Sequence, residues 1–341
     1  MQKKPIADWQ KALQNAFTEL DQLCKYLEIA PSKLSHQTIA HQSFPLKIPR
    51  SFADCIEKGN PNDPILRQVL PISEELTDVP NYLFDPVGDQ ASAPIPGILH
   101  KYSGRALLIT TGGCAINCRY CFRRNFPYSE FQLSSSRLQN ALAYIEQHTD
   151  INEIILSGGD PLLLNDQHLH ELIQSLNLFE HIKRIRIHSR IPVVLPERIT
   201  PELLTCLENS RQKVIMVIHA NHTNELSPQL AEACKKIAES GILLLNQSVL
   251  LKEVNDNAEQ LIALSEKLFQ FGILPYYLHL LDRAVGTAHF EVDRHTAIKL
   301  HQQLLKALPG YLVPKLVEEQ AGAPSKTWIN QNDSNRSPNQ T

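Results

Sequence analysis

From residue 105 onward, short apolar runs rich in β-branched residues alternate with longer segments whose apolar residues recur every three or four positions. The short runs are typical of buried strands, and the longer spacing is typical of amphipathic helices. The predicted strands are 106–111, 151–157, 182–188, 214–219, 243–251 and 273–281. The predicted helices between them are 134–147, 167–176, 201–208, 227–239 and 258–271. Strand and helix in repeated alternation predict an α/β fold with a parallel sheet.

Each predicted strand ends in polar residues or glycine, as in Thr-Gly-Gly-Cys, Ser-Gly-Gly-Asp and His-Leu-Leu-Asp. In α/β barrels, functional groups gather at the carboxyl ends of the strands. Six strands of this kind predict an incomplete (β/α)6 barrel that is open on one side. A doubly wound sheet is the alternative, although no Gly-x-Gly-x-x-Gly follows the first strand.

The part of the chain before residue 105 has a different pattern. Residues 8–29 carry apolar side chains at helical spacing and predict one amphipathic helix. Residues 31–104 are rich in Pro, Asn, Asp and Ser and predict short helices and loops without a strand. We therefore expect a helical and loop extension over 1–104, a barrel with a C-terminal lysine loop over 105–328, and a disordered polar tail over 329–341.

Composition excludes several classes of protein. The 341 residues contain 33 Lys and Arg against 36 Asp and Glu, a formal charge of −3. A general nucleic-acid or membrane-surface binder would need a basic face, which this balance does not favour. The apolar runs are too short to span a membrane, and residues 1–10 lack the apolar core of a signal peptide. We expect a cytoplasmic protein.

The seven cysteines are unevenly distributed. An odd number in a chain of this size argues against a disulfide framework. Four are scattered and predict inert buried thiols: Cys24, Cys55, Cys206 and Cys234. The other three crowd into the segment 114–121, directly after the first predicted strand: Cys114, Cys118 and Cys121.

The spacing Cys-x3-Cys-x2-Cys indicates a metal centre. Three thiolates on one tight loop can hold three irons of a cubane cluster and leave the fourth iron open for catalysis. A structural zinc ion takes four ligands, and no nearby Cys or His completes such a set. The sequence therefore favours an iron–sulfur cluster, with a zinc site or unligated core thiols as alternatives.

Cys-x3-Cys-x2-Cys after the first strand resembles the signature of the radical S-adenosylmethionine superfamily. The wider run 105–124 (RALLITTGGCAINCRYCFRR) resembles the lysine 2,3-aminomutase family in particular. Leu-Ser-Gly-Gly-Asp-Pro-Leu from residue 156, Asn-Gln-Ser-Val-Leu-Leu from residue 246 and Pro-Ser-Lys-Thr from residue 324 extend the resemblance over 50–328.

The resemblance implies a [4Fe-4S] cluster whose open iron binds S-adenosyl-L-methionine. An electron from a donor such as a flavodoxin or ferredoxin then releases the 5′-deoxyadenosyl radical. The residues implied to hold the methionine portion are Ser157, Gly158, Gly159 and Asp160, which alone would pass for a glycine turn. His219 and Gln247 are candidates for contacts to the adenosyl portion, although a lone histidine is more often structural.

Lys326 lies in a loop of small residues, Ala-Gly-Ala-Pro-Ser-Lys-Thr. Taken alone, it would be a solvated charge. The resemblance implies instead that its amine forms a Schiff base with pyridoxal 5′-phosphate, whose phosphate Arg105 helps to hold. Trp328 departs from the small residue or proline expected there and could reshape the loop.

Three further residues are implied to bind the substrate. The resemblance assigns Arg123 to the substrate carboxylate, and Asp282 and Glu319 to the ε-ammonium group of lysine. Taken alone, Arg123 would be a surface charge, Asp282 a salt-bridge partner of Arg283, and Glu319 part of a solvated face. At position 319 this chain has glutamate where some members have aspartate, which lengthens the reach of the carboxylate by one methylene. The implied reaction is the conversion of (S)-α-lysine to β-lysine.

Two other functions remain open at this stage. A glutamate 2,3-aminomutase would need a cationic residue to meet the distal carboxylate. A non-catalytic iron–sulfur sensor or a structural zinc module would need neither the Gly-Gly-Asp stretch nor the lysine loop. Within the family, the chain ends fifteen residues after Lys326 and so resembles the shorter branch. That branch supplies β-lysine for attachment to elongation factor P by a companion ligase.

Overall fold

A computed structural model describes residues 6–34 and 44–330, and within them nine strands form one sheet in the order β1-β2-β3-β4-β5-β6-β7-β8-β9. Strands β2 to β8 are parallel, and the outermost pairs at both ends are antiparallel. The bounds are β1 Ile98–Tyr102, β2 Arg105–Thr111, β3 Glu153–Gly158, β4 Arg184–Ser189, β5 Lys213–His219, β6 Leu243–Val249, β7 Leu274–His279, β8 Lys315–Glu318 and β9 Thr327–Trp328. The predicted strands are confirmed.

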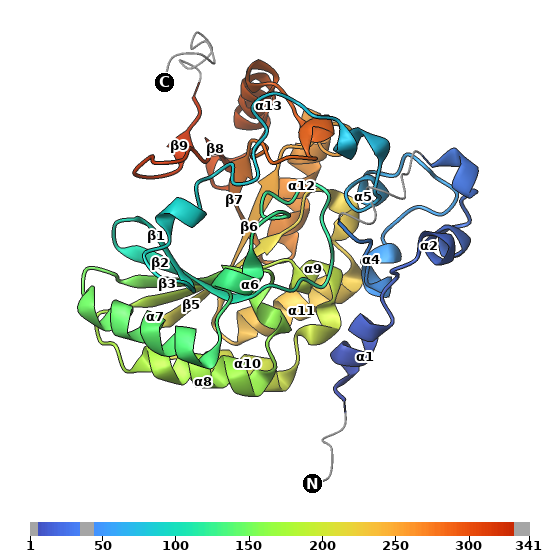
Figure 1. Cartoon of the computed structure of the whole chain (residues 1–341). Coiled ribbons are helices and arrows are strands. Elements are labelled where there is room, and N and C mark those ends of the chain that lie inside the picture. Colours follow the sequence, from blue (N-terminus) through green and yellow to red (C-terminus); the bar gives the residue numbers. More distant parts are fainter. Residues whose placement is uncertain (1–5, 35–43, 331–341) are drawn as a thin grey trace.

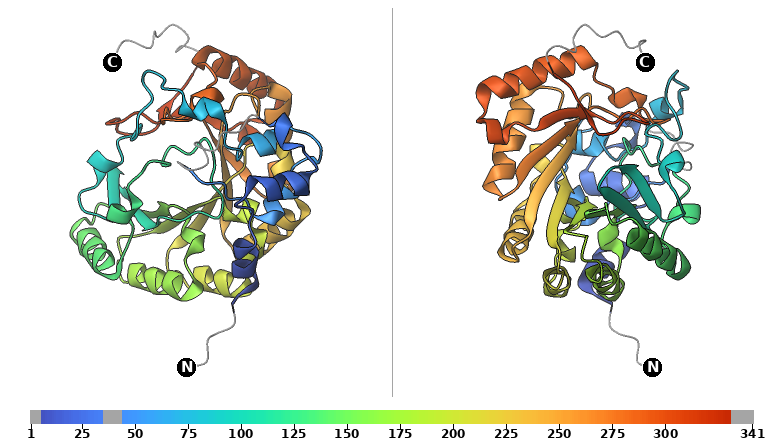
Figure 2. Two further views of the ribbon diagram at one scale, coloured as in Figure 1. Left: turned by 45° about the vertical axis from the view of Figure 1, so that its right-hand side comes forward. Right: turned by 90° about the vertical axis from the view of Figure 1, so that its left-hand side faces the viewer.

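The sheet curls into a partial barrel with its longer helices on the outside (Figure 1 and Figure 2). Strand order follows chain order without a reversal, which excludes the doubly wound alternative. The end strands β1 and β9 are not neighbours, so the barrel stays open between them. The partial barrel expected from the sequence is thus confirmed, although it contains a seventh parallel strand, β8, which the sequence did not predict.

The predicted helices are also confirmed, each to within two residues at either end. They are α7 Ser135–Gln147, α8 Asp166–Asn177, α10 Pro201–Glu208, α11 Pro228–Glu239 and α12 Ala258–Gln270. Each begins after a Ser, Asn or Thr whose side chain accepts a hydrogen bond from the first turn, as Ser227 does from Leu230. A further helix, α13 Arg294–Ala307, was not expected. Over 6–34 and 44–330, no helix is long and apolar enough to cross a membrane.

Short helical turns connect these elements. The α-helical ones are α4 Arg50–Ala53, α5 Pro64–Arg67, α6 Tyr128–Phe131 and α9 Ile191–Val194. The 3-10 turns are η1 Pro31–Lys33, η2 Ser73–Leu76, η3 Gln90–Ser92, η4 Pro161–Leu163, η5 Pro196–Arg198, η6 Thr223–Glu225, η7 Ala288–Phe290 and η8 Gly310–Leu312.

The single helix expected over 8–29 is wrong. The structure has two, α1 Asp8–Gln14 and α2 Leu20–Leu27, separated at Phe17. The backbone N–H of Phe17 donates to the carbonyl of Ile48 at 2.8 Å, and the N–H of Ile48 donates back at 3.0 Å. Phe17 is 2% exposed, so its burial and this bridge outweigh the intrahelical bonds that a continuous helix would form.

Strand β1 is a second correction, because no strand was expected before residue 105. Ile98 and Leu99 are buried, but His100, Lys101 and Tyr102 follow, so the segment lacks an alternating pattern. A turn at Gly104, with a φ of +75°, returns the chain into β2. The boundary expected between residues 104 and 105 falls inside this hairpin.

The core has a large apolar cluster shared by the N-terminal helices and the first strands of the barrel, and a smaller one between α12, α13, β7 and β8. Ile329 belongs to the smaller cluster, and its N–H donates to the carbonyl of Leu316 at 3.0 Å. The disordered tail expected from residue 329 is therefore wrong at its first residue, while 331–341 lie outside the described residues.

All seven cysteines are free thiols, as the absence of a disulfide pattern predicted. Cys24, Cys206 and Cys234 are buried, and Cys55 is only partly so. Burial raises the pKa of Cys55 to about 12, so this thiol is still unreactive at neutral pH.

Replacing Phe17 by alanine should lower the free energy of unfolding by about 3 to 5 kcal/mol, because the aromatic side chain is almost fully buried. Urea unfolding monitored by circular dichroism measures the loss. Phe269, which is 45% exposed, is the matched control, and its alanine variant should change stability by about 0.5 kcal/mol or less. Equal losses in both variants would contradict the proposed role of Phe17.

Candidate active site

The loop that carries Cys114, Cys118 and Cys121 follows β2 and is held against the N-terminal part of the chain. Lys47 Nζ donates to the carbonyl of Cys114 at 2.7 Å, and the N–H of Arg119 donates to the carbonyl of Gln68 at 2.8 Å. These bonds fix the loop that presents the three thiols.

The three thiols lie close enough to influence one another. Burial raises the pKa of Cys114 well above its usual value, and Cys121, Asp160 and Cys118 raise it further. Burial also raises the pKa of Cys121 to about 11, with Cys118 adding to the effect. Without a metal these two sulfurs stay protonated at neutral pH, and a metal that binds thiolates would displace those protons.

This donor set fits a cluster better than a single ion. Among residues 6–34 and 44–330, no three His, Cys, Asp or Glu side chains are grouped to hold one metal ion. A cubane takes each thiolate on a different iron, so it does not require its ligands to converge on one point. Three neighbouring thiols without a fourth ligand therefore match a cluster with one open iron.

The glycine stretch after β3 lies directly against the cysteine loop. The N–H of Gly159 donates to the carbonyl of Thr111 at 2.7 Å, and the N–H of Asp160 donates to the carbonyl of Gly113 at 2.8 Å. A Cβ at position 159 would lie 2.1 Å from the Gly113 carbonyl oxygen, so only glycine fits. Gly158 has a φ of +122°, which also favours glycine.

Asp160 is engaged by the protein itself. Its carboxylate accepts hydrogen bonds from Ser189 Oγ at 2.7 Å and from the N–H groups of Arg190, Ile191 and Leu162 at 2.8, 3.1 and 3.1 Å. Burial raises its pKa to about 6 despite these bonds. Asp160 thus braces the ends of β3 and β4 against each other behind the glycines.

A continuous series of ion pairs, extended at one end by a hydrogen bond, joins four of the predicted site residues. At one end, Arg123 Nη1 donates to Ser157 Oγ at 3.2 Å; at the other, Lys326 Nζ lies 2.5 Å from Glu319 Oε2. Two residues that the sequence did not single out connect them. The linking distances are 2.6 Å for Arg123–Asp89, 2.6 Å for Lys101–Asp89 and 3.0 Å for Lys101–Glu319.

Neither linking residue carried a usable signal in the sequence. Asp89 lies in the irregular region before the barrel, and Lys101 lies on the unexpected strand β1. The side chain of Asp89 is 2% exposed, which is rare for a carboxylate unless it is paired. Its two oxygens are occupied by Arg123 and Lys101.

The two acids implied to bind the ammonium group have opposite electrostatic environments. Burial raises the pKa of Glu319, but the ammonium groups of Lys326 and Lys101 outweigh it and hold this pKa well below its usual range. Burial and the nearby Glu319 raise the pKa of Asp282 to about 7. Glu319 is therefore ionised at neutral pH, while Asp282 is divided between its two forms.

Asp282 and Glu319 line one cavity of about 1340 Å³ at the carboxyl ends of β7 and β8. Other acidic residues of its wall are Asp256, Glu291, Asp293 and Glu318. The basic residues of its wall are Lys252, Arg283 and Arg294. Acids outnumber bases, so the cavity favours cations over anions.

His219, at the end of β5, is one of three histidines at strand ends whose Nε2 atoms are buried and have no hydrogen-bond partner among the described residues. The others, His188 on β4 and His279 on β7, were not predicted. Burial lowers the pKa of His219 to about 3, with Arg190 adding to the effect. Burial also lowers the pKa of His188 and His279 well below the usual value, so all three rings are neutral.

Gln247 lies on β6 directly beside His219, with which it is paired in register. The two candidates for the adenosyl portion are therefore neighbours. The sequence did signal His188 and His279, because both are polar residues at the ends of predicted strands. It did not distinguish them from structural histidines.

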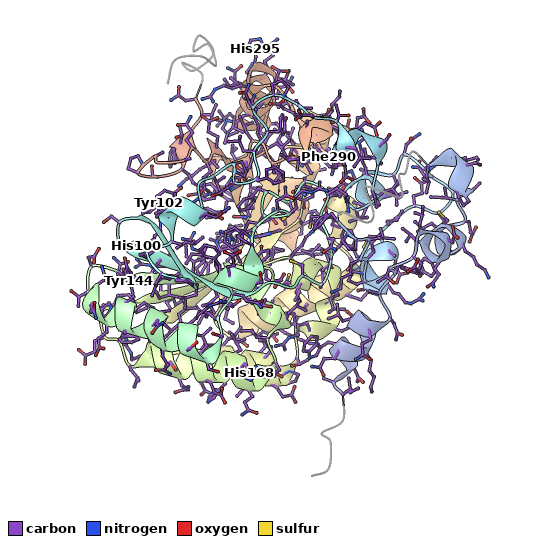
Figure 3. All side chains as sticks on the ribbon, in the orientation of Figure 1. His100, Tyr102, Tyr144, His168, Phe290 and His295 are labelled. Atoms are coloured by element: carbon purple, nitrogen blue, oxygen red, sulfur yellow. The ribbon has the colours of Figure 1, made fainter. Side chains whose placement is uncertain are left out.

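Arg105 lies at the start of β2, away from the cysteine loop, and its guanidinium lies 4.7 Å from the ring centroid of Tyr102. Tyr102 is labelled in Figure 3. Lys326 Nζ lies 6.0 Å from the ring centroid of Tyr277. Burial raises the pKa of Tyr277, and Arg105 is among the charges that oppose this rise. Trp328 is 59% exposed, with Lys315 Nζ 4.6 Å from its ring centroid. The tryptophan therefore lies against Lys315 on β8 and is otherwise exposed.

The sequence was compared with known proteins. Residues 108–264 match the model of the radical SAM superfamily. An L-lysine 2,3-aminomutase of Escherichia coli (strain K12) is 48% identical, with 94% of each chain covered. One of Haemophilus influenzae is 46% identical over 94% of this chain and 95% of that protein. The chain belongs to the lysine 2,3-aminomutase family.

A more distant member of the family, the L-lysine 2,3-aminomutase of Clostridium subterminale, is 34% identical over 94% of this chain and 77% of that protein. Membership implies a [4Fe-4S] cluster and S-adenosylmethionine, which the three neighbouring thiols fit. It also makes the chain an isomerase, so the alternatives of a sensor and a zinc module are wrong.

Replacing Gly159 by alanine should destabilise the protein by about 3 kcal/mol, because the new Cβ meets the backbone of the cysteine loop and cannot be relieved by a side-chain rotation. Iron bound after anaerobic reconstitution should fall as well, since the loop must move. Gly310→Ala is the control, because nothing lies within 4 Å of a Cβ at that position. Wild-type stability and iron content in the Gly159 variant would show that the contact is not required.

Proposed function

We propose that this protein converts (S)-α-lysine to β-lysine by a 1,2-shift of the amino group, with a [4Fe-4S] cluster, S-adenosylmethionine and pyridoxal 5′-phosphate. The observation that carries the proposal is the series of ion pairs from Arg123 to Lys326. The series brings the side chains of Arg123, Asp89, Lys101, Glu319 and Lys326 together, which supports one site that binds both ends of an amino acid beside a reactive lysine.

Arg123 is suited to bind the substrate carboxylate. A guanidinium presents two parallel N–H groups to a carboxylate, and Asp89 holds the Nε of Arg123 in place at 2.6 Å. Ser157 Oγ accepts from Nη1, which ties the arginine to the end of β3. The orientation of the guanidinium is thus fixed before substrate binds.

Glu319 and Asp282 are suited to bind the distal ammonium group. In the series and at Asp282, three acids (Asp89, Asp282 and Glu319) face three cations (Arg123, Lys101 and Lys326), and the cavity wall adds four further acids against three bases. A covalent bond between Lys326 and pyridoxal phosphate would remove one of these positive charges. The excess negative charge beside the cavity then favours lysine over glutamate, whose distal group is an anion.

The lysine loop and its neighbours fit pyridoxal phosphate. Lys326 would carry the cofactor, and Arg105, whose guanidinium lies over the ring of Tyr102 next to Lys101 on β1, would be suited to its phosphate. When bound, the cofactor supplies a π system that delocalises the substrate radical. The neutral rings of His188, His219 and His279 add no competing charge to the buried interior of the barrel.

Cys114, Cys118 and Cys121 would hold the cluster, and Ser157, Gly158, Gly159 and Asp160 the methionine portion of S-adenosylmethionine. Gln247 and His219 are placed beside each other for the adenosyl portion. The bound cofactors supply the radical after one-electron reduction by a donor such as a flavodoxin or ferredoxin. The protein's own task is to position the substrate and exclude water from the radical.

We also propose that the β-lysine serves for attachment to elongation factor P by a lysyl-ligase. The chain is 48% and 46% identical to the relatives of Escherichia coli and Haemophilus influenzae, each covered over at least 94% of its length, against 34% for that of Clostridium subterminale. This pattern supports membership of the shorter branch of the family.

The proposed reaction is tested anaerobically with reconstituted protein, S-adenosylmethionine, pyridoxal phosphate, dithionite and labelled lysine. β-Lysine should form only when all three cofactors are present. Cys114→Ala should lose the cluster and all activity, whereas Lys326→Ala should lose the pyridoxal absorbance band and activity but keep the cluster. Formation of 5′-deoxyadenosine without β-lysine would overturn the substrate assignment and leave the radical chemistry standing.

The apparent KM for lysine should fall as the pH rises through about 7. The raised pKa of Asp282 means that this carboxyl is neutral below that pH and becomes an anion above it, which strengthens its attraction for an ammonium group. Asp282→Asn should abolish this dependence and raise KM at pH 8 by about tenfold or more.

Asp293→Asn is the matched control, because Asp293 lines the same cavity and an asparagine can still cap α13. Steady-state kinetics between pH 6 and about 8.5 measure both variants. A pH profile of KM that survives in Asp282→Asn would assign the dependence to another group.

A further inference from the structure

Arg190 follows β4 directly and makes a contact that the proposed reaction does not use. Its Nη1 donates a hydrogen bond to the Sγ of Cys118 at 2.7 Å. The residue is 5% exposed, and its backbone N–H is held by the carboxylate of Asp160 at 2.8 Å. A buried guanidinium therefore points at one of the three sulfurs that face the cluster.

The rest of the guanidinium is fixed by a buried polar network. Nη1 also donates to Tyr120 Oη at 2.5 Å, and Nη2 donates to Gln68 Oε1 at 2.8 Å and to Glu225 Oε2 at 3.1 Å. Gln68 and Glu225 are completely buried. The other oxygen of Glu225 accepts from Gln68 Nε2 and from the N–H groups of Asn221 and His222. The donor to Cys118 is thus oriented in advance, because each of its neighbours is itself held.

This arrangement is more than a structural ion pair. Glu225 balances the charge of this buried arginine through Nη2, and Nη1 donates to a cysteine sulfur instead of to a second carboxylate. An N–H donor and a nearby positive charge stabilise a metal-bound thiolate more strongly when the cluster carries one more electron. The reduced state of the cluster gains more from Arg190 than the oxidised state does.

We propose that Arg190 is a positioning residue that raises the reduction potential of the cluster through its hydrogen bond to Cys118, with Glu225 holding the guanidinium in place. The step concerned is the addition of one electron from an external one-electron donor to the oxidised cluster, in which no protein bond forms or breaks. A less negative potential makes the cluster easier for that donor to reduce. The inference rests on the proposed cluster at the three cysteines and is independent of the amino acid substrate.

The test compares variants that change the hydrogen-bond donor to Cys118 with a control variant that removes a buried arginine elsewhere in the protein. Arg190→Met together with Glu225→Gln removes both charges and leaves no buried unpaired carboxylate. Arg190→Lys keeps the positive charge but loses the planar guanidinium and its several N–H donors. Arg198→Met is the matched control, because Arg198 is fully buried but donates to the carbonyls of Leu162 and Leu164 and pairs with Asp166.

Each reconstituted protein is titrated with dithionite at a series of potentials, and the reduced cluster is followed by electron paramagnetic resonance. The double variant should titrate at a more negative midpoint potential than the wild type. Arg190→Lys should shift in the same direction by less, and Arg198→Met should match the wild type. Iron and sulfide content, measured on the same samples, identifies the proteins that carry a complete cluster.

The proposal is overturned if Arg190→Lys, or any Arg190 variant with a complete cluster, titrates at the wild-type potential. It is also overturned if Arg198→Met shifts as far as they do, since that would make the effect a general response to a lost buried charge. A wild-type protein that assembles no cluster at all would instead refute the proposed function. The two failures are therefore distinguishable.

Discussion

The close approach of two backbones at the ends of β2 and β3 determines how the rest of the site is built. Gly159 and Gly113 leave no space for a side chain between them, and two hydrogen bonds continue the pairing of the strands into their loops. The cysteine loop is on one side of this contact, and Asp160 on the other continues it to β4 through Ser189 and Arg190. Three consecutive strand ends are thus locked into one rigid edge that carries the three cysteines proposed to bind the cluster.

The substrate side of the site is organised by charge instead of backbone contact. Arg123, Asp89, Lys101, Glu319 and Lys326 alternate in sign along one series of ion pairs. A buried charge is costly unless it is paired, and in this arrangement each member is paired on both sides or at the end of the series. Removing one of these charged side chains deprives each neighbour of a charged partner, so the five side chains act as a unit.

The sequence was sufficient for features that depend on local pattern. The parallel strands, the helices between them and the cysteine triplet all have short-range signatures, and the structure confirms the strands and helices. The break at Phe17, the strand at Ile98–Tyr102 and the burial of Ile329 depend on contacts with distant residues, and no local pattern announces them. The same limit applies to the site. Arg123 and Lys326 could be assigned by resemblance, but Asp89, Lys101 and Arg190 become significant only when their partners are seen.

The ion pair between Lys101 and Glu319 has a consequence for how the protein matures. These residues are 218 positions apart in the chain and lie near opposite ends of the sheet, and they meet because the sheet curls into a partial barrel. Contacts between neighbouring strands can form early at small cost in loop entropy, whereas this one requires nearly the whole chain to be in place. A ribosome-bound intermediate that lacks β8 can contain the cysteine loop and most of the barrel, yet it has neither Glu319 nor Lys326. The end of the site that contains Glu319 and Lys326 is therefore the last to be completed.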